Sequence, residues 1–413
     1  MLTAYCCLLT LAFPLFYARL SVSLSIAAST LDFSQHHELL PSPEAQSVTA
    51  SRLSLSNIGP TLSLKAQPTV VYRPSSVEAL HRARMRSMRY SESERVEWNR
   101  VEVLGPAVQD IHTLAQLARM SGNAYALPGK KNWYDLDGSW NTSFPFGWED
   151  PADGFRGHVF ISSDNSTIIL SIKGTTVQGP SSKKDKFNDN LLFSCCCARV
   201  DISWVFRTVC DCYARNWKCD NTCLSEALIQ DSLFYSVGVN LVEDLLVLYP
   251  TANIWLVGHS LGGALASLLG STFGLPAVAF ESPGERLAAK RLHLPLPPPL
   301  LNGSASPVPI THVYHTGDPI PQGTCTGIGS PCTQAGYALE TRCHLGKSIV
   351  FDTVNVLGWK VDVRKHVIKD VITKVLEADV IDWEDGRNVP FAREEEDCVD
   401  CFKWEFGEYK GDR

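Results

Sequence analysis

The pentapeptide Gly258-His259-Ser260-Leu261-Gly262 holds the residues best arranged for chemistry in this chain. A short apolar run, residues 254–257, precedes it, and a segment rich in small residues, 261–273, follows it. This context predicts a buried strand, a sharp turn and a helix, the local structure that exposes a nucleophilic serine in G-x-S-x-G enzymes. Only small residues fit at both ends of the pentapeptide, because larger side chains there would collide with the neighbouring strand and helix. We therefore predict Ser260 as a nucleophile.

A carboxylate must follow this turn if Ser260 is to react. A serine hydroxyl is a weak nucleophile until a base removes its proton, and the base needs an acidic group that holds its tautomer. In enzymes with this turn, the acid follows the serine in the chain and the histidine follows the acid. Asp318 comes after an expected strand, within Gly317-Asp318-Pro319, and we predict it as the acid. Asp352 and Asp362 are the alternatives.

The base must be one of the two histidines that follow Asp318. His366 directly precedes residues 367–376, a segment whose apolar residues recur at helical spacing. His344 follows Cys343 and therefore falls in a region expected to form disulfides. We predict His366 as the base, with His344 as the alternative.

Two hydrogen-bond donors must stabilise the oxyanion that forms when an ester or amide carbonyl is attacked. One is the backbone N–H of Leu261, which directly follows the nucleophile. The other is expected in the loop after an earlier strand. Residues 168–173 form such a strand and Gly174-Thr175-Thr176 ends it, so we assign Thr175 as the second donor.

Strands and helices alternate around these residues. The expected strands are Gly157–Ile161, Thr167–Lys173, Ile254–Val257, Ala277–Phe280 and Ile310–His315. The expected helices are Val108–Met120, Asp231–Leu248, Leu261–Phe273 and Val367–Leu376. This alternation predicts an α/β-hydrolase fold, a mostly parallel central sheet flanked by helices on both faces.

Composition narrows the class of protein. The chain has 413 residues, of which 45% are hydrophobic, which is enough for one large core. Its formal net charge is −7, and a nucleic-acid-binding protein would show a basic stripe instead. The arginines between residues 82 and 89 are followed by glutamates between residues 92 and 97, which indicates a solvated helix face.

Cysteines and glycosylation sequons indicate an oxidising compartment. The chain has 14 cysteines, and N-x-[ST] sequons begin at Asn141, Asn165 and Asn302. Cytosolic enzymes rarely carry so many cysteines, and such sequons are modified only in the secretory pathway. We predict glycosylation at the three asparagines and a lumenal position for the bulk of the chain.

The N-terminus is apolar from Leu2 to Tyr17, and a weaker apolar patch continues to Ala28. The run lacks the basic start of a signal peptide and is slightly short for a membrane span. We predict an uncleaved single membrane anchor in residues 1–28, with cleavage near Ala28 as the alternative. Residues 29–60 are expected to form a stalk or leader, and residues 61–405 the catalytic domain.

A cysteine-rich insert is expected at about residues 190–225, between the oxyanion strand and the helix before the turn. It contains seven cysteines: Cys195, Cys196, Cys197, Cys210, Cys212, Cys219 and Cys223. Five more lie near the C-terminus, so full oxidation requires one or three cross-links between the two odd sets. Zinc at Cys219 and Cys223 is the alternative, but no matching histidine pair is nearby, and we predict neither a metal nor a cofactor. We expect the insert to act as a lid or a membrane-contact surface.

Four segments together resemble the class 3 lipases. They are Ile172-Lys173-Gly174-Thr175-Thr176, the stretch Val257–Ala266, Phe280-Glu281-Ser282-Pro283-Gly284, and Gly317-Asp318-Pro319-Ile320-Pro321. The cysteine-rich insert, Trp133-Tyr134-Asp135-Leu136 and the apolar N-terminus are similar to the fungal autophagy-related lipases in particular. The resemblance covers roughly residues 60–405.

This resemblance implies an activity, a location and a set of partners. It implies a single-pass type II membrane protein that passes through endosomes and multivesicular bodies to the vacuole. There it would hydrolyse membrane phospholipids and neutral-lipid esters, opening autophagic bodies and delivered vesicles. The family nucleophile falls on Ser260 and the triad acid on Asp318. The residues alone also allow another serine hydrolase of the secretory pathway, such as an esterase, a thioesterase or a peptidase, or a catalytically inactive membrane-binding module.

Overall fold

The computed structural model describes residues 63–409, apart from residues 141, 199–208, 230–232, 300–306, 328 and 380. The expected membrane segment and stalk, and the sequons at Asn141 and Asn302, lie outside the described residues. Within the described ranges, no helix combines the length and the apolar character that a membrane span requires.

A seven-stranded sheet, in the order β10-β9-β8-β7-β5-β4-β3, forms the centre of the molecule. Five neighbouring strands, β5 and β7 to β10, are parallel, whereas β3 and β4 run antiparallel at one edge. The bounds are β3 Thr142–Phe146, β4 Gly157–Ile161, β5 Thr167–Ile172, β7 Asn253–His259, β8 Ala277–Phe280, β9 Ile310–His315 and β10 Lys347–Phe351. The central strands β5, β7 and β8 are mostly apolar and are buried along almost their whole length, because helices cover both faces. The prediction of a mostly parallel α/β sheet is confirmed.

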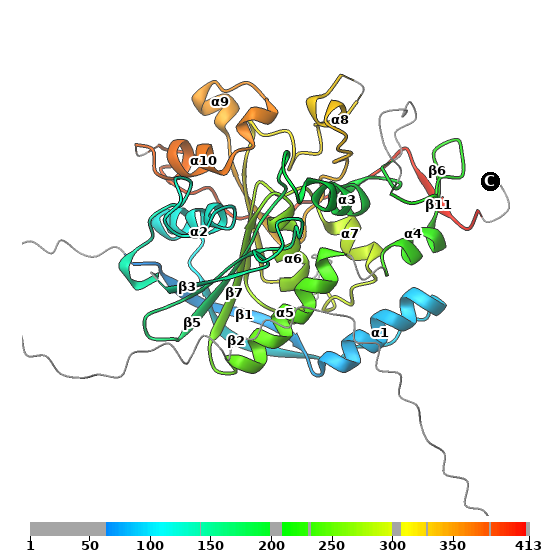
Figure 1. Cartoon of the computed structure of the whole chain (residues 1–413), viewed down its shortest axis with the longest axis horizontal. Helices are drawn as coiled ribbons and strands as arrows, with labels where there is room; N and C mark the ends of the chain where they lie inside the picture. The colour runs from blue at the N-terminus through cyan, green and yellow to red at the C-terminus, as the bar shows by residue number, and fades with distance from the viewer. Residues whose placement is uncertain are drawn as a thin grey trace, which may run out of the picture. The chain divides into compact units, whose positions relative to one another are not determined.

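Two helices on each side matter most for the site (Figure 1). On one face, α2 (Ile111–Asn123) packs on β7 and against the segment that follows α10 (Ile368–Asp370). On the other face, α6 (Leu261–Phe273) crosses β7 and β8 and is covered in turn by α5 (Phe234–Leu248). Every residue of α6 is buried, which explains why its sequence consists of small and apolar residues.

The predicted elements differ from the observed ones mainly at their ends. The helix α2 begins at Ile111 rather than at residue 108, because the Asp110 side chain caps it by accepting from the Thr113 N–H. The strand β5 ends at Ile172. The single helix expected over residues 367–376 is wrong in its geometry, since only three residues are α-helical and a π-helical segment, Val371–Leu376, continues it.

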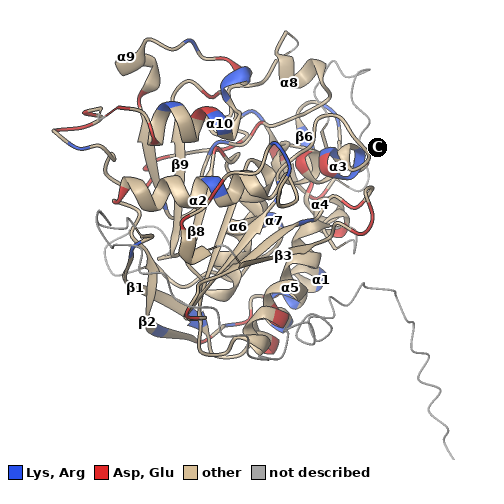
Figure 2. Cartoon of the chain, turned by 60° about the vertical axis from the view of Figure 1, so that its left-hand side comes forward, with Lys and Arg blue, Asp and Glu red and all other residues tan. Residues whose placement is uncertain are grey.

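Two strands near the N-terminal end of the described residues were not predicted from the sequence. The strands β1 (Ala66–Pro74) and β2 (Trp98–Pro106) pair antiparallel, with α1 (Val77–Tyr90) between them in sequence. On α1, the arginines form ion pairs with the acidic residues that follow: Arg82 with Glu94, and Arg86 with Glu92. Figure 2 shows basic and acidic residues on many of the same helices and loops.

Shorter elements complete the fold. They are α3 Ser182–Phe193, β6 Lys218–Asp220, α4 Asn221–Ala227, α7 Arg286–Arg291, α8 Pro331–Gln334, α9 Thr353–Leu357 and β11 Glu405–Gly407. The strand β11 pairs in parallel with β6, so the C-terminal segment becomes part of the cysteine-rich insert.

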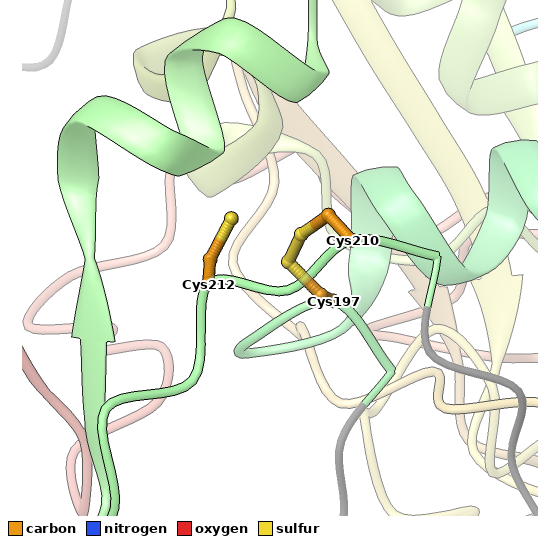
Figure 3. Close-up of side chains that lie close together, drawn as sticks. All are labelled: Cys197, Cys210 and Cys212. Atoms are coloured by element: carbon orange, nitrogen blue, oxygen red, sulfur yellow. A yellow bond between two sulfur atoms is a disulfide. The ribbon is translucent and has the colours of Figure 1, made fainter. Parts of the chain in front are cut away.

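Six disulfides join the twelve cysteines of the described residues. The pairs are Cys195–Cys401, Cys196–Cys219, Cys197–Cys210, Cys212–Cys223, Cys325–Cys332 and Cys343–Cys398. Three close within the insert, and Figure 3 shows one of these, with the sulfur of Cys212 nearby. One pair, Cys195–Cys401, joins the two odd sets, which is the smaller of the two numbers of cross-links predicted from the sequence.

Candidate active site

The backbone at Ser260 is strained in the way that a nucleophile turn requires. Ser260 has φ 59° and ψ −130°, between the end of β7 and the first residue of α6. A Cβ on Gly258 would lie 2.3 Å from the backbone of Gly262, and a Cβ on Gly262 would lie 2.1 Å from the carbonyl oxygen of Ile172. Both positions therefore exclude any other residue, which agrees with the collisions expected from the pentapeptide.

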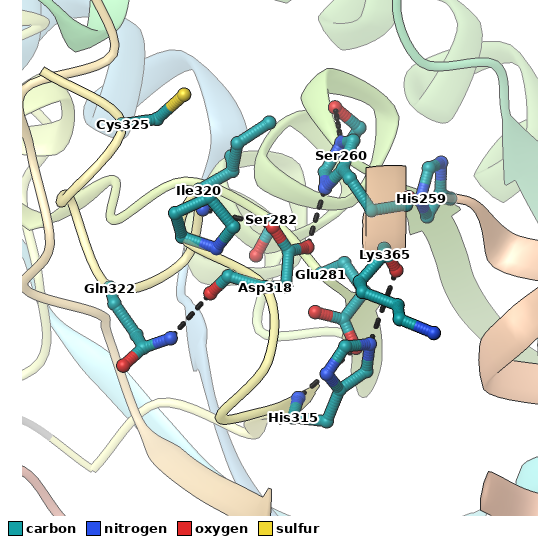
Figure 4. A network of polar contacts seen from close by, with 12 residues as sticks. His259, Ser260, Glu281, Ser282, His315, Asp318, Ile320, Gln322, Cys325 and Lys365 are labelled. Atoms are coloured by element: carbon teal, nitrogen blue, oxygen red, sulfur yellow. Dashed lines mark hydrogen bonds and ion pairs between the residues drawn. The ribbon is translucent and has the colours of Figure 1, made fainter. Parts of the chain in front are cut away.

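Three side chains form a hydrogen-bonded line at the carboxyl ends of the parallel strands. The Ser260 hydroxyl lies 2.8 Å from Nε2 of His366, and Nδ1 of His366 lies 2.6 Å from Oδ2 of Asp318. Asp318 is fully buried, whereas the His366 side chain is 16% exposed and Ser260 is 8% exposed. Figure 4 shows Ser260 and Asp318 within this network. Burial would raise the pKa of Asp318, but the charge and hydrogen bond of His366 outweigh it and lower that pKa.

The residues named as alternatives for the acid and the base form their contacts away from Ser260. Asp352 caps α9 and accepts from the Thr316 hydroxyl. Asp362 pairs with Arg364 on the surface. His344 is buried, with Nδ1 2.6 Å from Glu395 and Nε2 3.1 Å from the carbonyl oxygen of Ser282. None of the three contacts Ser260, so the geometry favours Asp318 and His366.

The loop after β5 lies directly against the nucleophile turn. A Cβ added to Gly174 would come within 2.2 Å of the His259 carbonyl oxygen and 3.1 Å of the Ser260 Cβ. The next residue, Thr175, lies with its hydroxyl 2.5 Å from Oδ2 of Asp189 on α3. Burial raises the pKa of Asp189 to about 8, against the opposing effect of the hydrogen bond from Thr175. The N–H of Leu261 lies in the first turn of α6, where backbone donors have no partner within the helix.

A buried ion pair fixes the shape of this loop. Lys173 Nζ lies 2.9 Å from Oδ2 of Asp185 and also donates to the Gly174 carbonyl oxygen. The same carboxylate oxygen accepts from the Thr176 N–H at 2.8 Å and from the Ser181 hydroxyl at 3.1 Å. The loop that carries Thr175 is thus tied to α3 on both sides of that residue.

His259 connects the nucleophile turn to the histidine loop. Its Nε2 lies 2.8 Å from the carbonyl oxygen of His366, and its Nδ1 lies 2.9 Å from the Tyr125 hydroxyl. A carbonyl only accepts, so Nε2 carries the proton and Nδ1 accepts from Tyr125. Burial, together with the charge on His366, lowers the pKa of His259 to about 3, so this ring stays neutral. The backbone of His366 is thereby held by the residue next to Ser260.

Sequence reasoning missed Tyr125, Asp185, Asp189 and Glu281, all of which lie around the triad. Tyr125 and the two aspartates lie outside any motif, and only the fold brings them to the turn. Glu281 stands within the quoted segment Phe280–Gly284 but received no role. A charged residue directly after a buried strand was the signal that could have identified it.

Two groups in the described residues have the composition of a metal site. The first, Cys197, Cys210 and Cys212, consists of cysteines that are all in disulfides. The second is Glu285 with His312 and His344. His344 directs both ring nitrogens at hydrogen-bond acceptors, so neither nitrogen offers a lone pair to a metal.

Comparison with known proteins gives a consistent result. The family model for class 3 lipases matches residues 182–278. A protein of Cryptococcus neoformans named "Putative lipase ATG15" is 48% identical over 372 residues, covering 76% of this chain and 70% of that protein. Its namesake in Saccharomyces cerevisiae is 47% identical over 325 residues, covering 76% of this chain and 60% of that protein.

Solved structures also match parts of the chain. The Lip2 lipase of Yarrowia lipolytica is 18% identical and covers 57% of this chain and 77% of its own, with a TM-score of 0.31. A lipase of Rhizopus microsporus var. chinensis is 18% identical and covers 58% of this chain and 74% of its own, with a TM-score of 0.30.

Proposed function

The chain belongs to the ATG15 family of class 3 lipases and is a carboxylic ester hydrolase, and from this premise we propose how it acts and on what. Ser260 is the nucleophile, His366 the base and Asp318 the acid. The observation that carries this proposal is the hydrogen-bonded line of the three side chains, at 2.8 and 2.6 Å. Its geometry needs no rearrangement before a proton moves from Ser260 to His366.

In the first half of the reaction the serine is acylated. Oγ of Ser260 attacks the ester carbonyl carbon while Nε2 of His366 takes the hydroxyl proton, and Asp318 stabilises the imidazolium that forms. The oxyanion accepts hydrogen bonds from the N–H of Leu261 and from Thr175. His366 then gives its proton to the departing alcohol, which leaves an acyl ester on Ser260.

In the second half, water replaces the alcohol. His366 removes a proton from the attacking water, the second oxyanion collapses, and Ser260 recovers its proton as the fatty acid leaves. Neither half requires a metal or a cofactor.

We propose membrane phospholipids as the substrate class, with neutral-lipid esters as further substrates. The support is family membership together with the cysteine-rich insert, which directly follows α3, the helix that holds the oxyanion loop through Asp185 and Asp189. Arg291 of α7 donates to the carbonyl oxygens of Ser194 and Cys195, so the base of the insert is anchored. Residues 199–208 of the insert lie outside the described part of the chain.

The proposed site of action is the vacuole, where the enzyme would degrade autophagic bodies and vesicles of multivesicular bodies. The name of the relatives supports an autophagic role, and the six disulfides support an oxidising compartment. The proposed route is that of a single-pass type II membrane protein, anchored by residues 1–28. Its test is the location of a C-terminally tagged chain in fungal cells, with and without that segment.

Glycosylation supports the same route and can be tested alone. Asn165 is exposed in the turn between β4 and β5, with φ 58°, so a glycan there meets no steric obstacle. Asn141, Asn165 and Asn302 are the proposed acceptors. Endoglycosidase treatment should increase the gel mobility of the secretory protein, and each Asn→Gln change should remove one step of that shift.

The decisive experiment compares the oxidised full-length enzyme with two serine variants on phospholipid vesicles. Ser260→Ala should abolish release of fatty acid and lysophospholipid. The matched control is Ser271→Ala on the same helix, whose buried hydroxyl has no hydrogen-bond partner among the described residues and whose removal should leave the activity unchanged. A soluble short-chain ester is assayed in parallel.

Each result has a definite meaning. Loss of vesicle hydrolysis in Ser260→Ala alone supports the proposal. Activity confined to the soluble ester would replace the phospholipid substrate with a small ester, and equal activity of wild type and Ser260→Ala would overturn the assigned nucleophile.

A further inference from the structure

Glu281 is a buried carboxyl group next to the triad, and the mechanism above does not use it. It directly follows β8, its side chain is completely buried, and its φ of 45° is left-handed. Its N–H donates to the Val313 carbonyl oxygen at 3.0 Å, which fixes the backbone in this conformation. A buried carboxylate and a left-handed backbone are each unfavourable for a glutamate, so the surroundings must compensate for both.

The two oxygens of Glu281 have different surroundings. Oε1 accepts from the backbone N–H of His315 at 3.1 Å. Oε2 is buried and receives no hydrogen bond from a described residue. The carboxyl group of Asp318 lies close enough to that of Glu281 for the two side chains to influence each other's ionisation. Figure 4 shows the two carboxyl groups next to each other.

Asp318 already uses both of its oxygens as acceptors. Oδ2 accepts from Nδ1 of His366 at 2.6 Å, and Oδ1 accepts from the Ile320 N–H at 2.9 Å. This pattern requires an ionised Asp318. Two carboxylates sharing one buried site repel each other strongly, so one of the two must carry a proton.

No cation is placed to neutralise a second carboxylate. Within the described chain, neither Glu281 nor Asp318 forms an ion pair with a lysine or an arginine. Nε2 of His315 lies 3.7 Å from Oε1 of Glu281, but it lies closer, 3.2 Å, to the carbonyl oxygen of Lys365, which only accepts. Burial lowers the pKa of His315, so this ring is neutral.

We propose that Glu281 is a protonated positioning residue of the triad, whose Oε2–H donates a hydrogen bond to Asp318 and keeps that carboxylate ionised and directed at His366. This inference rests on the triad proposed above. Burial and the charge of Asp318 both raise the pKa of Glu281 well above its ordinary value, in agreement with the contacts. A single proton on Oε2 of Glu281 thus explains both the unpaired oxygen and the nearness of the Asp318 carboxylate.

The proposal has a consequence for pH. The titratable groups that face Glu281 are Asp318, His366, His315 and Tyr314, and burial raises the pKa of Tyr314, so that residue stays neutral. A carboxyl group with a raised pKa contributes stability that is complete below its unfolded pKa of about 4.5 and is lost as pH rises through its folded pKa. Ionised Glu281 would also repel Asp318 from its position, so activity should fall on the alkaline side.

The test uses the oxidised full-length enzyme and two substitutions of Glu281. Glu281→Gln replaces the O–H by an amide N–H and keeps the carbonyl acceptor, so it mimics the protonated acid at all pH values. Glu281→Leu removes donor and acceptor. Glu340→Gln is the matched control, because Glu340 is a largely buried glutamate with a raised pKa that contacts Cys195 rather than the triad.

The expected result is a difference between the two substitutions. Glu281→Gln should keep kcat within about threefold of wild type and flatten the alkaline decline of both kcat and the thermal midpoint. Glu281→Leu should lower kcat by about 10- to 100-fold with KM little changed, the loss expected for a hydrogen bond to a charged group. Glu340→Gln should keep the wild-type pH profile of kcat.

Two outcomes would overturn the inference while leaving the triad intact. One is a Glu281→Gln enzyme that has lost as much kcat as Glu281→Leu, which would mean that Glu281 acts as an anion. The other is an unchanged alkaline decline in Glu281→Gln. The comparison of wild type with Glu281→Gln decides the matter even if Glu281→Leu does not fold. An inactive wild type, or an active Ser260→Ala, would instead contradict the proposed function.

Discussion

Ser260 occupies a backbone conformation that costs about 1–3 kcal/mol for a residue with a side chain. The cost is met by the two glycines of the turn and by contacts that hold the residues around it. Three of these contacts come from side chains that the sequence did not single out: Tyr125, Asp189 and Glu281. The nucleophile turn is thus supported from α3 through the oxyanion loop, from the residues just after α2, and from the end of β8.

Tyr125 is the first of these residues that can be tested. Its hydroxyl donates to Nδ1 of His259 at 2.9 Å, and His259 in turn holds the His366 carbonyl oxygen. In Tyr125→Phe the buried Nδ1 loses its donor, which costs about 1–3 kcal/mol, so kcat should fall by about tenfold with KM little changed. Steady-state kinetics on vesicles provide the measurement. Tyr90→Phe is the control, since Tyr90 is 66% exposed, and an unchanged kcat in Tyr125→Phe would show that His366 needs no such support.

Residue types in a short motif identified Ser260, and chain order narrowed the acid and the base to a few candidates. Distinguishing Asp318 from Asp352, or His366 from His344, required the fold, because each is separated from Ser260 by more than 50 residues of sequence. Glu281 could not be given a role from sequence. Its proposed protonation depends on the nearness of Asp318, which follows the neighbouring strand β9.

The helix α6 packs so closely on the neighbouring strands that several of its glycines leave no room for a Cβ atom. The helix α6 approaches β5 so closely that Gly262 touches the Ile172 carbonyl oxygen, and Gly270 and Gly263 allow similar approaches to β8 and its ends. Small residues on this helix are therefore a packing requirement, which also explains why the helix was easy to predict.

A single methyl group at Gly262 should test this packing. In Gly262→Ala the new Cβ would lie 2.1 Å from backbone, which cannot move without shifting β5. We expect a loss of unfolding free energy of about 3 kcal/mol or more and little remaining activity. Gly138→Ala is the control, because nothing lies within 4 Å of its Cβ position. The comparison is made by chemical denaturation, and equal stabilities of the two variants would show that the turn relaxes.

The strands β4, β5, β7, β8 and β9 and the nucleophile helix were predicted to within two residues at each end, because their apolar runs end at glycine, proline or polar residues, whereas β3 and β10 of the same sheet were not predicted. The π-helical continuation of α10 was not predicted. Apolar spacing at residues 367–376 fits an α-helix equally well, so the sequence does not distinguish it from the π-helical segment that packs against α2. The strands β1 and β2 were missed because partial exposure leaves their sequences mixed.

At the scale of the whole molecule, the C-terminal segment closes the structure. It pairs with β6, bonds through Cys398 and Cys401 to two distant regions, and places Glu395 against His344. Cysteine counting correctly required an odd number of cross-links between the insert and the remaining cysteines. Which cysteines pair could not be read from the sequence, because pairing depends on the sheet order.

The cross-link Cys195–Cys401 should contribute more stability than the smallest loop. It joins residues 206 positions apart, whereas Cys325–Cys332 closes a loop of seven. Restriction of the unfolded chain predicts a loss of about 5 kcal/mol when the first pair is replaced by alanines, and of about 2 kcal/mol for the second. Denaturant unfolding of the two double variants gives the comparison. Equal losses would mean that native-state contacts, not loop length, determine the effect.

Because of the ion pair between Glu395 and His344, we expect the protein to be most stable at mildly acidic pH. Burial opposes ionisation of both groups, but their hydrogen bond and mutual charge outweigh it, lowering the pKa of Glu395 to about 2 and raising that of His344. The carboxylate contributes stability above its unfolded pKa of about 4.5, lost as pH falls through about 2. The His344 imidazolium contributes stability below its unfolded pKa of about 6.5. This contribution is lost as pH rises through its folded pKa. Both contributions to stability are complete only at pH values between these two unfolded pKa values, from about 4.5 to about 6.5.

Glu395→Gln should therefore destabilise the protein most at about pH 5, by about 2–4 kcal/mol, and less once the pH has risen through the folded pKa of His344. Thermal unfolding across this range is the measurement, and the exposed neighbour Glu396→Gln is the control. A loss that does not vary with pH would assign the effect to packing rather than to charge.

The distance between Cys195 and Cys401 also orders events during biosynthesis. Cys196 and Cys197 meet their partners after only 23 and 13 further residues have emerged, whereas Cys195 must wait for 206. At about 5–20 residues per second, that wait lasts roughly 10–40 s. Throughout it, a free thiol stands beside two newly formed disulfides and can exchange with them. Correct maturation of the insert thus depends on Cys401, a cysteine translated long after the insert itself. A chain truncated before residue 401 would lack the thiol that ends this exchange.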